Sequence, residues 1–356
     1  MKKYEISFPK QETRVITCKS IHYVREIRKV FPDKTELFLL TDRNVFSLYN
    51  EHIRQFINSF SKLIVEVIPP GERSKNMSNL KKILNKLAEK GFSRNTLFVT
   101  MGGGVIGDIG GLSASIYMRG VDLIHIPTTL LSQIDSAFGG KTAVNLSYGK
   151  NLAGSFHNAK LILLNNEYLT THNNRLWIEG LAEMIKYAVG FDKMLFLELE
   201  DFLLSSQNFN EVNWDKWIEK CYKLKMSICL EDPDEKSNRV LLNIGHTIGH
   251  ALEKLKQFRL SHGKSVLFGI IEEAKISRKF HFLSIEEEQR IVNLINSREF
   301  LKIRLRPSLE SITANIKWDK KRRDINMLFP VIDSIGSSHI EYIKLDKLIK
   351  LILSKD

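Results

Sequence analysis

The sequence predicts an α/β domain with a parallel, Rossmann-like sheet, followed by a mainly α-helical domain. Short apolar runs rich in Val, Ile, Leu and Phe recur in the first half of the chain, at residues 37–40, 64–68, 97–100, 123–126 and 161–164. Such runs are typical of parallel strands that are buried on both faces. After about residue 175 helical patterns replace them, so we place the two domains at residues 1–174 and 175–356.

Helical patterns separate or follow these strands. Between the second and third runs, Leu80, Ile83, Leu84 and Leu87 lie on one stripe of a helix that Gly91 can end. Strands that alternate with helices indicate a parallel sheet. In the second domain, helical patterns cover residues 178–190, 193–204, 211–230, 240–256, 263–280 and 284–298.

Composition and charge exclude several classes of protein. The chain has 356 residues, 43% of them hydrophobic and 26% charged, which is typical of a soluble globular protein. We expect no membrane association, because no apolar run has transmembrane length and the N-terminus lacks an apolar signal core. Three cysteines do not form a disulfide framework, which favours a reducing, cytoplasmic setting. The net charge of +12 is scattered along the chain, and this favours a small anionic substrate over nucleic acid.

Histidines form the most distinctive pattern in the sequence. His246 and His250 share a face if they lie on a helix, and His262 follows after an expected break. Three imidazoles from adjacent segments suit a catalytic zinc ion, which takes three protein ligands and leaves one position open. Ordinary histidines that make hydrogen bonds are the alternative. Glu183 could add a carboxylate ligand, or it could form a surface ion pair with Lys186.

A glycine-rich segment, residues 101–111, follows one predicted strand and opens a predicted helix. Gly102, Gly104 and Gly107 match the pattern G-x-G-x-x-G, in which glycines let backbone N–H groups approach a pyrophosphate at a helix N-terminus. A tight turn without a ligand is the alternative, and the position after a middle strand differs from an ordinary first Rossmann unit. Polar loops also follow other strands at the edge where open α/β sheets bind ligands, at residues 41–44, 70–75 and 127–129.

Two further groups of polar residues indicate an anionic ligand. One group lies among glycines and suits a phosphate or carboxylate, although a solvated basic loop would look similar; it contains Arg119, Asp135, Lys141, Lys150 and Asn151. The other group is predicted to share one helix face as the wall of an active site, and contains Arg239, Asn243, His246 and His250.

The chain resembles the 3-dehydroquinate synthase family of sugar-phosphate cyclases from Asp42 to Gly336, and the most specific segments are residues 102–120, 126–151, 180–187 and 243–253. The resemblance implies an NAD-binding α/β domain, a helical metal-binding domain, an active site in the cleft between them and a homodimer. It also implies a cytoplasmic lyase of the shikimate pathway, which leads to chorismate and the aromatic amino acids.

The resemblance further implies the site residues. Zn²⁺, or Co²⁺ in its place, would be bound by Glu183, His246 and His262. NAD would be bound by Asp42, Asn44, Gly71, Glu72, Lys75, Gly104, Val105, Ile106, Gly107, Asp108, Thr128, Thr129, Lys141, Lys150, Tyr168, Leu169, Thr170 and Thr171. Substrate binding and catalysis would use Arg119, Asp135, Lys141, Lys150, Asn151, Lys186, Lys225, Glu235, Arg239, Asn243 and His250, with Glu235 and His250 as candidates for proton transfer. Lys320 or Lys321 would also reach the substrate.

The implied reaction converts 3-deoxy-D-arabino-heptulosonate 7-phosphate into 3-dehydroquinate and phosphate. NAD would oxidise a ring hydroxyl polarised by the metal, phosphate would leave by elimination, and the hydride would return before ring opening and aldol closure. The rival interpretations are a 2-deoxy-scyllo-inosose synthase, a dehydrogenase of the glycerol type and a non-catalytic basic binding protein. The loop at residues 139–142 favours the dehydroquinate reaction.

Two departures from the family pattern stand out. Lys264 follows His262-Gly263 where the family usually has Glu, and the segment between Lys321 and Pro330 is short. A cation at Lys264 is expected to weaken metal binding, or to need a nearby anion such as Glu272 or Glu273.

Overall fold

The computed structural model describes residues 12–232, 237–255, 260–304, 307–320 and 326–354. The chain divides into two compact units, Met1–Leu169 and Thr170–Asp356. The boundary proposed from the sequence falls a few residues later, at residue 174.

The first unit is built on a parallel six-stranded sheet. Its strands lie in the order β1 (Arg14–Thr17), β8 (Leu161–Leu164), β5 (Asp122–Pro127), β4 (Leu97–Gly102), β2 (Glu36–Asp42) and β3 (Lys62–Ile68). The five predicted apolar runs all lie in this sheet, which confirms the predicted α/β fold class. Strand β1 was not predicted. Strand β3 lies at the sheet edge, so its residues before Ile68 are half-buried, whereas the sequence predicted a buried strand.

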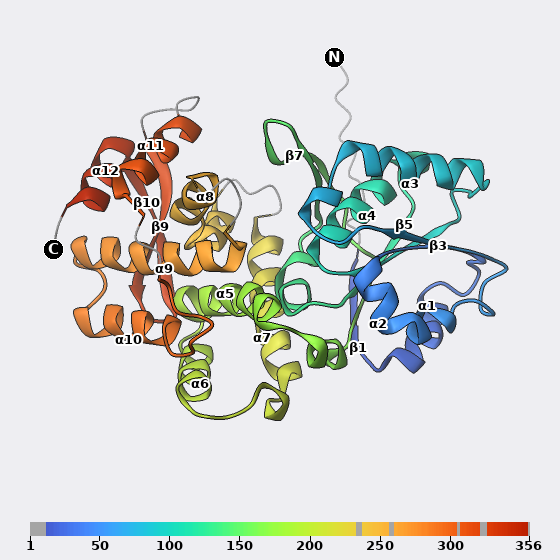
Figure 1. Ribbon diagram of the computed structural model, residues 1–356, viewed down its shortest axis with the longest axis horizontal. Coiled ribbons are helices and arrows are strands. Elements are labelled where there is room, and N and C mark those ends of the chain that lie inside the picture. Colours follow the sequence, from blue (N-terminus) through green and yellow to red (C-terminus); the bar gives the residue numbers. More distant parts are fainter. Residues whose placement is uncertain (1–11, 233–236, 256–259, 305–306, 321–325, 355–356) are drawn as a thin grey trace, which may run out of the picture. The chain divides into compact units, whose positions relative to one another are not determined.

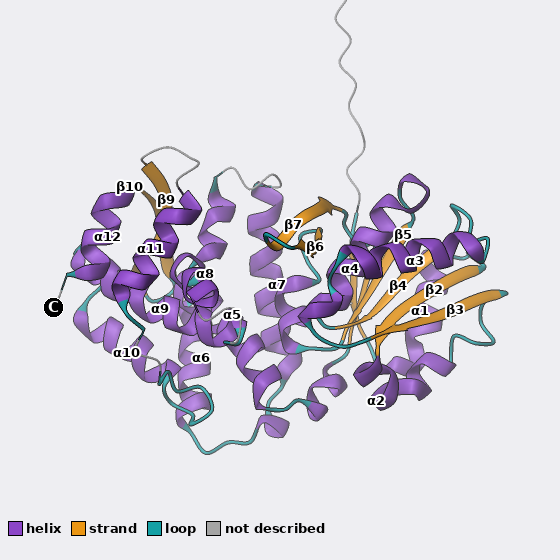
Figure 2. Cartoon of the chain, turned by 45° about the horizontal axis from the view of Figure 1, so that its top comes forward, coloured by secondary structure: helices purple, strands orange, loops and turns teal. Residues whose placement is uncertain are grey.

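Helices cover both faces of this sheet (Figures 1 and 2). Helices α1 (Tyr23–Val30) and α2 (Arg43–Arg54) pack on one face, where Leu37, Leu39 and Val99 join their core. Helices α3 (Met77–Glu89) and α4 (Gly104–Ile116) cover the other face. The predicted helical stripe is confirmed in α3, because Leu80, Ile83 and Leu87 are buried.

An antiparallel hairpin packs against α4 and was not predicted. It consists of β6 (Lys141–Leu146) and β7 (Gly149–Phe156). Alternate residues of β6, Thr142 and Val144, are buried, and Ser155 of β7 donates a hydrogen bond to the Ser115 hydroxyl at 2.8 Å. The short turns of this unit are η1 (Ser20–His22), η2 (Glu72–Ser74), η3 (Tyr117–Arg119), the π-helical η4 (Ser132–Ser136) and η5 (Asn166–Thr171), which runs into the second unit.

The second unit is mainly helical, as predicted. Its helices are α5 (Asn174–Phe191), α6 (Lys193–Leu204), η6 (Phe209–Glu211), α7 (Trp214–Glu231), η7 (Asn238–Asn243), α8 (His246–Leu255), α9 (His262–Lys279), α10 (Ile285–Ile295), α11 (Leu309–Lys320) and α12 (Leu345–Leu353). An antiparallel pair, β9 (Asn326–Ser334) and β10 (Ser337–Lys344), was not predicted. Phe329 and Val331 of β9 share a core with Ile248, Leu252 and Ile312.

The helix predicted for residues 240–256 is wrong in its first part. A 3₁₀ turn, η7, ends at Asn243, and α8 begins at His246. Between them Gly245 has φ +77°, a left-handed conformation that an α-helix cannot contain and that glycine adopts readily. Arg239 and Asn243 therefore do not lie on the helix that carries His246 and His250.

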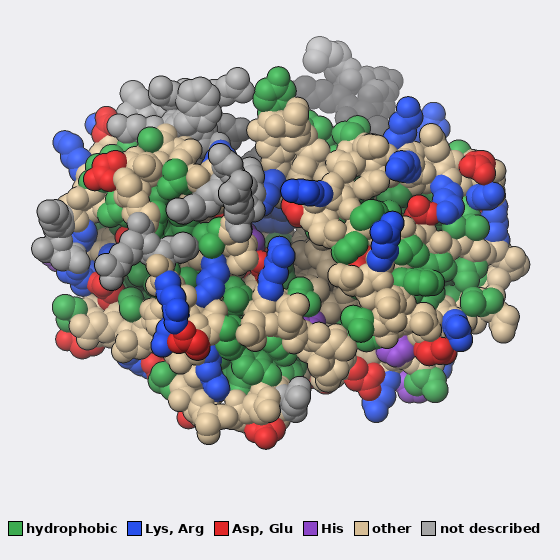
Figure 3. All heavy atoms as spheres, viewed as in Figure 1, with side chains coloured by type: hydrophobic (Ala, Val, Ile, Leu, Met, Phe, Trp, Pro, Cys, Tyr) green, Lys and Arg blue, Asp and Glu red, His purple; other side chains and the backbone are tan. Residues whose placement is uncertain are grey.

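The surface and the helices carry two further observations. Lys and Arg side chains are dispersed over the face shown in Figure 3, with Asp and Glu among them. Among the described residues, no helix has both the length and the apolar content needed to cross a membrane.

Close packing between α4 and the sheet gives a test of the fold. A Cβ atom at Gly110 would lie 2.3 Å from Thr100 Cγ2, whereas one at Gly107, also in α4, would lie 3.9 Å from its nearest neighbour, His125 Cε1. We expect Gly110→Ala to destabilise this unit by about 1–3 kcal/mol through overpacking. Gly107→Ala should leave the stability unchanged or raise it by up to about 1 kcal/mol.

Amide hydrogen exchange of peptides from β4 and α4, measured across a urea series, reports this local stability. Equal losses of protection in the two variants would contradict the packing argument.

Candidate metal and active site

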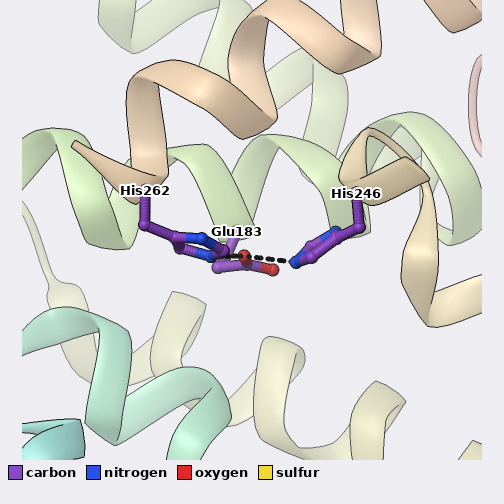
Figure 4. Close-up of side chains that lie close together, drawn as sticks. All are labelled: Glu183, His246 and His262. Atoms are coloured by element: carbon purple, nitrogen blue, oxygen red, sulfur yellow. Dashed lines mark hydrogen bonds and ion pairs between the residues drawn. The ribbon is translucent and has the colours of Figure 1, made fainter. Parts of the chain in front are cut away.

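Three helices of the second unit bring Glu183, His246 and His262 together. Glu183 lies in the middle of α5, while His246 and His262 are the first residues of α8 and α9. The Oε1 atom of Glu183 lies 3.3 Å from His246 Nε2 and 3.1 Å from His262 Nε2 (Figure 4). One potential ligand atom from each residue lies within 4.8 Å of the others. These are the three residues that the family resemblance implied as metal ligands.

Close packing of α9 against the backbone of α5 and of the turn before α8 brings these three residues together. A Cβ atom at Gly269 of α9 would lie 1.9 Å from the carbonyl oxygen of Gly245, and one at Gly263 would lie 2.5 Å from the carbonyl oxygen of Ile178 in α5. Larger residues at either position would separate the helices. Glycine at these positions lets α9 approach both the turn before His246 and the helix that carries Glu183.

Neighbouring groups keep the Glu183 carboxylate ionised although it is buried. Its exposed fraction is 1%, and Lys186 Nζ lies 2.5 Å from its Oε2 atom, so their ion pair is buried rather than on the surface. Burial alone would raise the pKa of Glu183, but Lys186 and the imidazole of His246 hold that pKa well below its usual range. The carboxylate is therefore available as a ligand.

The Nδ1 atom of each imidazole also has a hydrogen-bond partner. His246 Nδ1 lies 3.1 Å from the Ile244 carbonyl oxygen, and His262 Nδ1 lies 3.0 Å from Glu253 Oε1. Burial lowers the pKa of His262, but its hydrogen bonds with Glu183 and Glu253 outweigh this effect and raise the pKa to about 10. Metal-binding histidines commonly have a backbone carbonyl or carboxylate on the second nitrogen. A carboxylate and two imidazoles that face one point fit Zn²⁺ or Co²⁺.

His250 lies beside these three residues. Its ring centre is 5.3 Å from that of His246 and 6.2 Å from that of His262, and its side chain is exposed. The geometry thus favours the set with Glu183 over three histidines, although metal binding itself stays a prediction.

Other residues proposed for the substrate are distributed over the second unit. Arg239, in η7, and Lys225, on α7, are both buried, and Asn243 ends η7. Asp232 Oδ2 accepts hydrogen bonds from the backbone N–H groups of Ser237 and Arg239 at 2.7 and 3.0 Å. Glu235 and Lys321, and the side chain of Lys320, lie outside the described part of the chain.

In the first unit, the predicted glycine turn joins β4 to α4. Gly103 precedes α4 without a side-chain cap, and the Thr128 N–H after β5 donates to the Gly102 carbonyl at 3.0 Å. A Cβ atom at Gly103 would lie 3.1 Å from Thr129 Cγ2, and one at Gly104 would lie 3.1 Å from Ser136 Oγ. These turns therefore lie together at the carboxyl edge of the sheet, where backbone N–H groups of a helix N-terminus favour an anion.

A buried lysine links three of the proposed NAD-binding segments. Lys75, which is 4% exposed, contacts both Asp108 in the first turns of α4 and Asn151 in β7. Asn145, which the sequence did not single out, donates to Glu72 Oε1 at 2.7 Å and accepts from the Asn151 N–H at 2.9 Å. The network thus joins the loop after β3, helix α4 and the hairpin.

Other proposed NAD-binding residues have structural contacts. Tyr168 is buried in the core of the first unit, where its hydroxyl accepts from Tyr23 at 3.0 Å, and Leu169 is also buried. The Asp42 carboxylate accepts from the N–H groups of Asn44 and Val45 and caps α2, and burial raises its pKa. The neighbouring Thr170 and Thr171 belong to the second unit.

The polar residues proposed to bind phosphate lie on several elements. Arg119 is exposed and has φ +63° in η3, after α4, and Asp135 is half-buried in the π-helical η4. Lys141 is exposed at the start of β6, and Lys150 is half-buried in β7.

Comparisons with known proteins address the family. The family described as "3-dehydroquinate synthase N-terminal" matches residues 65–179, and "3-dehydroquinate synthase C-terminal" matches residues 180–322. The chain belongs to the 3-dehydroquinate synthase family. The 3-dehydroquinate synthase of Thermoanaerobacter pseudethanolicus is 36% identical over 329 residues, which cover 92% of each chain. The predicted family is therefore confirmed.

Two solved structures of other synthases have the same fold. A 2-epi-5-epi-valiolone synthase from Streptomyces hygroscopicus, with NAD⁺ and Zn²⁺ bound, has a TM-score of 0.85 at 24% identity and covers 98% of each chain. A 2-deoxy-scyllo-inosose synthase in complex with carbaglucose-6-phosphate, NAD⁺ and Co²⁺ has a TM-score of 0.80 at 22% identity and covers 96% of each chain. At these identities the likeness establishes the fold of this 3-dehydroquinate synthase family member.

Of the two expectations for Lys264, the structure contradicts the one that gave it Glu272 or Glu273 as a partner, and weaker metal binding stays a prediction. Its ammonium group donates to the Lys302 carbonyl at 2.7 Å, and burial lowers its pKa. Glu272 pairs with Lys275 at 2.7 Å, while Glu273 accepts from the Gly245 N–H at 2.6 Å. Neither carboxylate is the partner that the sequence suggested.

Neighbouring histidines on α8 give a matched test of the ligand set. We expect purified protein to contain one divalent ion per chain. His246→Ala should lose most of this metal because it removes one of three converging ligand atoms, whereas His250→Ala should keep it.

Elemental analysis of both variants after dialysis checks this expectation. Full metal content in His246→Ala, or an equal loss in His250→Ala, would exclude the proposed ligand set.

Proposed function

We propose that this chain is a 3-dehydroquinate synthase that converts 3-deoxy-D-arabino-heptulosonate 7-phosphate into 3-dehydroquinate and phosphate. It works in the shikimate pathway in the cytoplasm, with NAD and Zn²⁺ or Co²⁺. The observation that carries the proposal is the convergence of Glu183, His246 and His262 in a member of this family. The two solved synthases that contain NAD⁺ with Zn²⁺ or Co²⁺ support the choice of cofactors.

The proposed residues form a metal site and a separate NAD site. When bound, NAD supplies the transient oxidation of a ring hydroxyl, and the divalent ion polarises that hydroxyl oxygen. Glu183, His246 and His262 would hold the ion. The backbone of Gly104–Asp108 would face the pyrophosphate, and Lys75 keeps that turn beside the loop after β3.

The anionic substrate requires cations and a proton carrier. Arg119, Lys141 and Lys150 of the first unit are proposed to neutralise its phosphate or carboxylate, with Asp135 and Asn151 as polar contacts. Lys186, Lys225, Arg239 and Asn243 are proposed to contact it from the second unit. His250 is exposed next to the proposed metal ligands, so its imidazole can exchange protons with a bound substrate.

Turnover in the presence of NAD separates a synthase from a dehydrogenase. In the proposed reaction the hydride returns to the molecule that released it. We therefore expect many phosphates per NAD from the heptulosonate phosphate, without a rise in NADH absorbance. Lys141→Ala should lower kcat/KM about 10- to 150-fold, because it removes a charge-assisted contact worth about 1.5–3 kcal/mol.

Lys82→Ala, which removes an exposed lysine of α3, is the control and should keep wild-type activity. NADH that accumulates one for one with product would favour a dehydrogenase. Absence of phosphate release would reject the synthase.

The proposed assembly is a homodimer that uses the β6–β7 hairpin. Thr142 and Val144 on one face of this hairpin are buried, whereas Leu152, Phe156 and the turn residue Tyr148 are 61%, 62% and 96% exposed. An exposed apolar surface with a large aromatic residue is typical of protein interfaces. A second copy of the chain would remove this surface from water.

Charge placed on this apolar face should separate the two copies. We expect wild type to sediment at twice the 41.1 kDa of one chain. The double variant Leu152→Lys/Phe156→Lys should sediment as a monomer, because like charges would meet or be buried at the interface. Leu204→Lys, at an exposed leucine of α6, is the control and should stay dimeric. A dimeric double variant would exclude this hairpin as the interface.

A further inference from the structure

Two buried carboxylates, one on α8 and one on α9, each contact the first residues of the other helix. Glu253 lies near the end of α8, and its Oε1 atom lies 3.0 Å from Nδ1 of His262, the first residue of α9. Glu273 lies on α9, and its carboxylate accepts from the backbone N–H groups of Gly245, at 2.6 Å, and Ile248. These two N–H groups flank His246, the first residue of α8. Each helix thus holds the start of the other.

Core packing alone does not explain these carboxylates. Glu253 is 3% exposed and Glu273 is completely buried, and a buried carboxylate is unfavourable unless specific contacts offset its lost hydration. Among the described residues, Glu273 Oε1 has no hydrogen-bond partner. An apolar side chain would fill this place at a lower cost. The contact that distinguishes Glu273 from such a side chain is the one to the turn before His246.

Glu273 acts on His246 through this turn. Gly269 precedes Glu273 by one helical turn, so both lie on the face of α9 that meets the Gly245 backbone. The Ile244 carbonyl, directly before Gly245, lies 3.1 Å from His246 Nδ1. A fixed Gly245 therefore fixes the carbonyl that orients the imidazole.

Glu253 acts on His262 directly. The Glu253 contact with Nδ1 fixes the orientation of the His262 ring, so that Nε2 on the opposite side faces Glu183. In addition, Glu179 accepts from the Gly263 N–H at 2.7 Å and ties the start of α9 to α5. A shift of α8 along α9 would break the contacts of Glu253 and Glu273 together.

We propose that Glu253 and Glu273 are positioning residues that together set the separation of the His246 and His262 Nε2 atoms, and so determine how tightly the site binds a divalent ion. This inference rests on the proposed metal-dependent function. It goes beyond that function because it assigns the ligand geometry to a reciprocal pair of contacts between two helices.

The test compares side chains of similar size that differ in hydrogen-bond acceptance. Glu253→Met and Glu273→Met remove the acceptor, whereas Glu253→Gln and Glu273→Gln keep an amide oxygen in its place. Co²⁺ affinity of the full chain is measured by competition with a chelator, and the visible absorption of bound Co²⁺ reports the ligand geometry. We expect each Met variant to bind Co²⁺ about 10- to 100-fold more weakly with an altered spectrum. Each Gln variant should keep the wild-type affinity and spectrum.

Folding is monitored separately. The four tryptophans of the chain, Trp177, Trp214, Trp217 and Trp318, all belong to the second unit, so their fluorescence reports whether this unit stays folded. Should a Met variant not fold, Glu253→Asp and Glu273→Asp replace it. They keep the charge but are one methylene shorter, and the same loss of Co²⁺ affinity is expected.

Three results would overturn the inference. Met and Asp variants that bind Co²⁺ as tightly as wild type would show that the carboxylates do not position the ligands. Gln variants that lose as much affinity as Met variants would show that charge, rather than hydrogen-bond geometry, is responsible. Wild type that binds no Co²⁺ would reject the metal part of the proposed function and this inference with it. The inference alone fails when wild type binds Co²⁺ and releases phosphate but the variants do not differ.

Discussion

Burial of the Glu183 carboxylate is the constraint on which the second unit depends. A charged group with a 1% exposed fraction requires partners that replace its hydration. Lys186 provides one from the same helix, but the imidazoles of His246 and His262 come from the starts of two others. Helices α5, α8 and α9 must therefore converge at one point. The glycines at 263 and 269 make that convergence sterically feasible, because any side chain there would meet backbone atoms.

The first unit meets a different requirement. Its proposed ligand is a pyrophosphate, which backbone N–H groups bind without a buried charge of their own. The β4–α4 turn accordingly lacks side chains at Gly102, Gly103 and Gly104. Charged side chains lie beside this turn, where Lys75 forms an ion pair with Asp108. Lys75 also contacts Asn151 of the hairpin. One unit is thus organised by close backbone approach, and the other by compensation of a buried charge.

Sequence patterns predicted the strands and helices whose formation depends on interactions between residues close in the chain. Apolar runs identified five of the six strands of the parallel sheet, and the stripe around Leu80 and Ile83 identified α3. The hairpin β6–β7 was missed because its burial depends on packing against α4. The break before His246 was missed because Gly245 is held in place by α9. In the site, Glu253 could have been found from its helical spacing with His246 and His250, but Glu273 depends on a tertiary contact that no spacing reveals.

Two adjacent positions at the start of α9, Gly263 and Lys264, differ in how closely they are packed. A cation in the first turn of a helix faces the positive end of the helix dipole, and this interaction is unfavourable. Here the ammonium group instead lies against the Lys302 carbonyl, and the anions Glu179, Glu183 and Glu253 keep their own partners. The residue before Lys264 has no such freedom, because a side chain at Gly263 would collide with the backbone of α5. The convergence of the proposed ligands therefore depends on the close contacts of α9 with α5 and with the turn before α8, whereas the Lys264 ammonium group makes its hydrogen bond elsewhere, with Lys302.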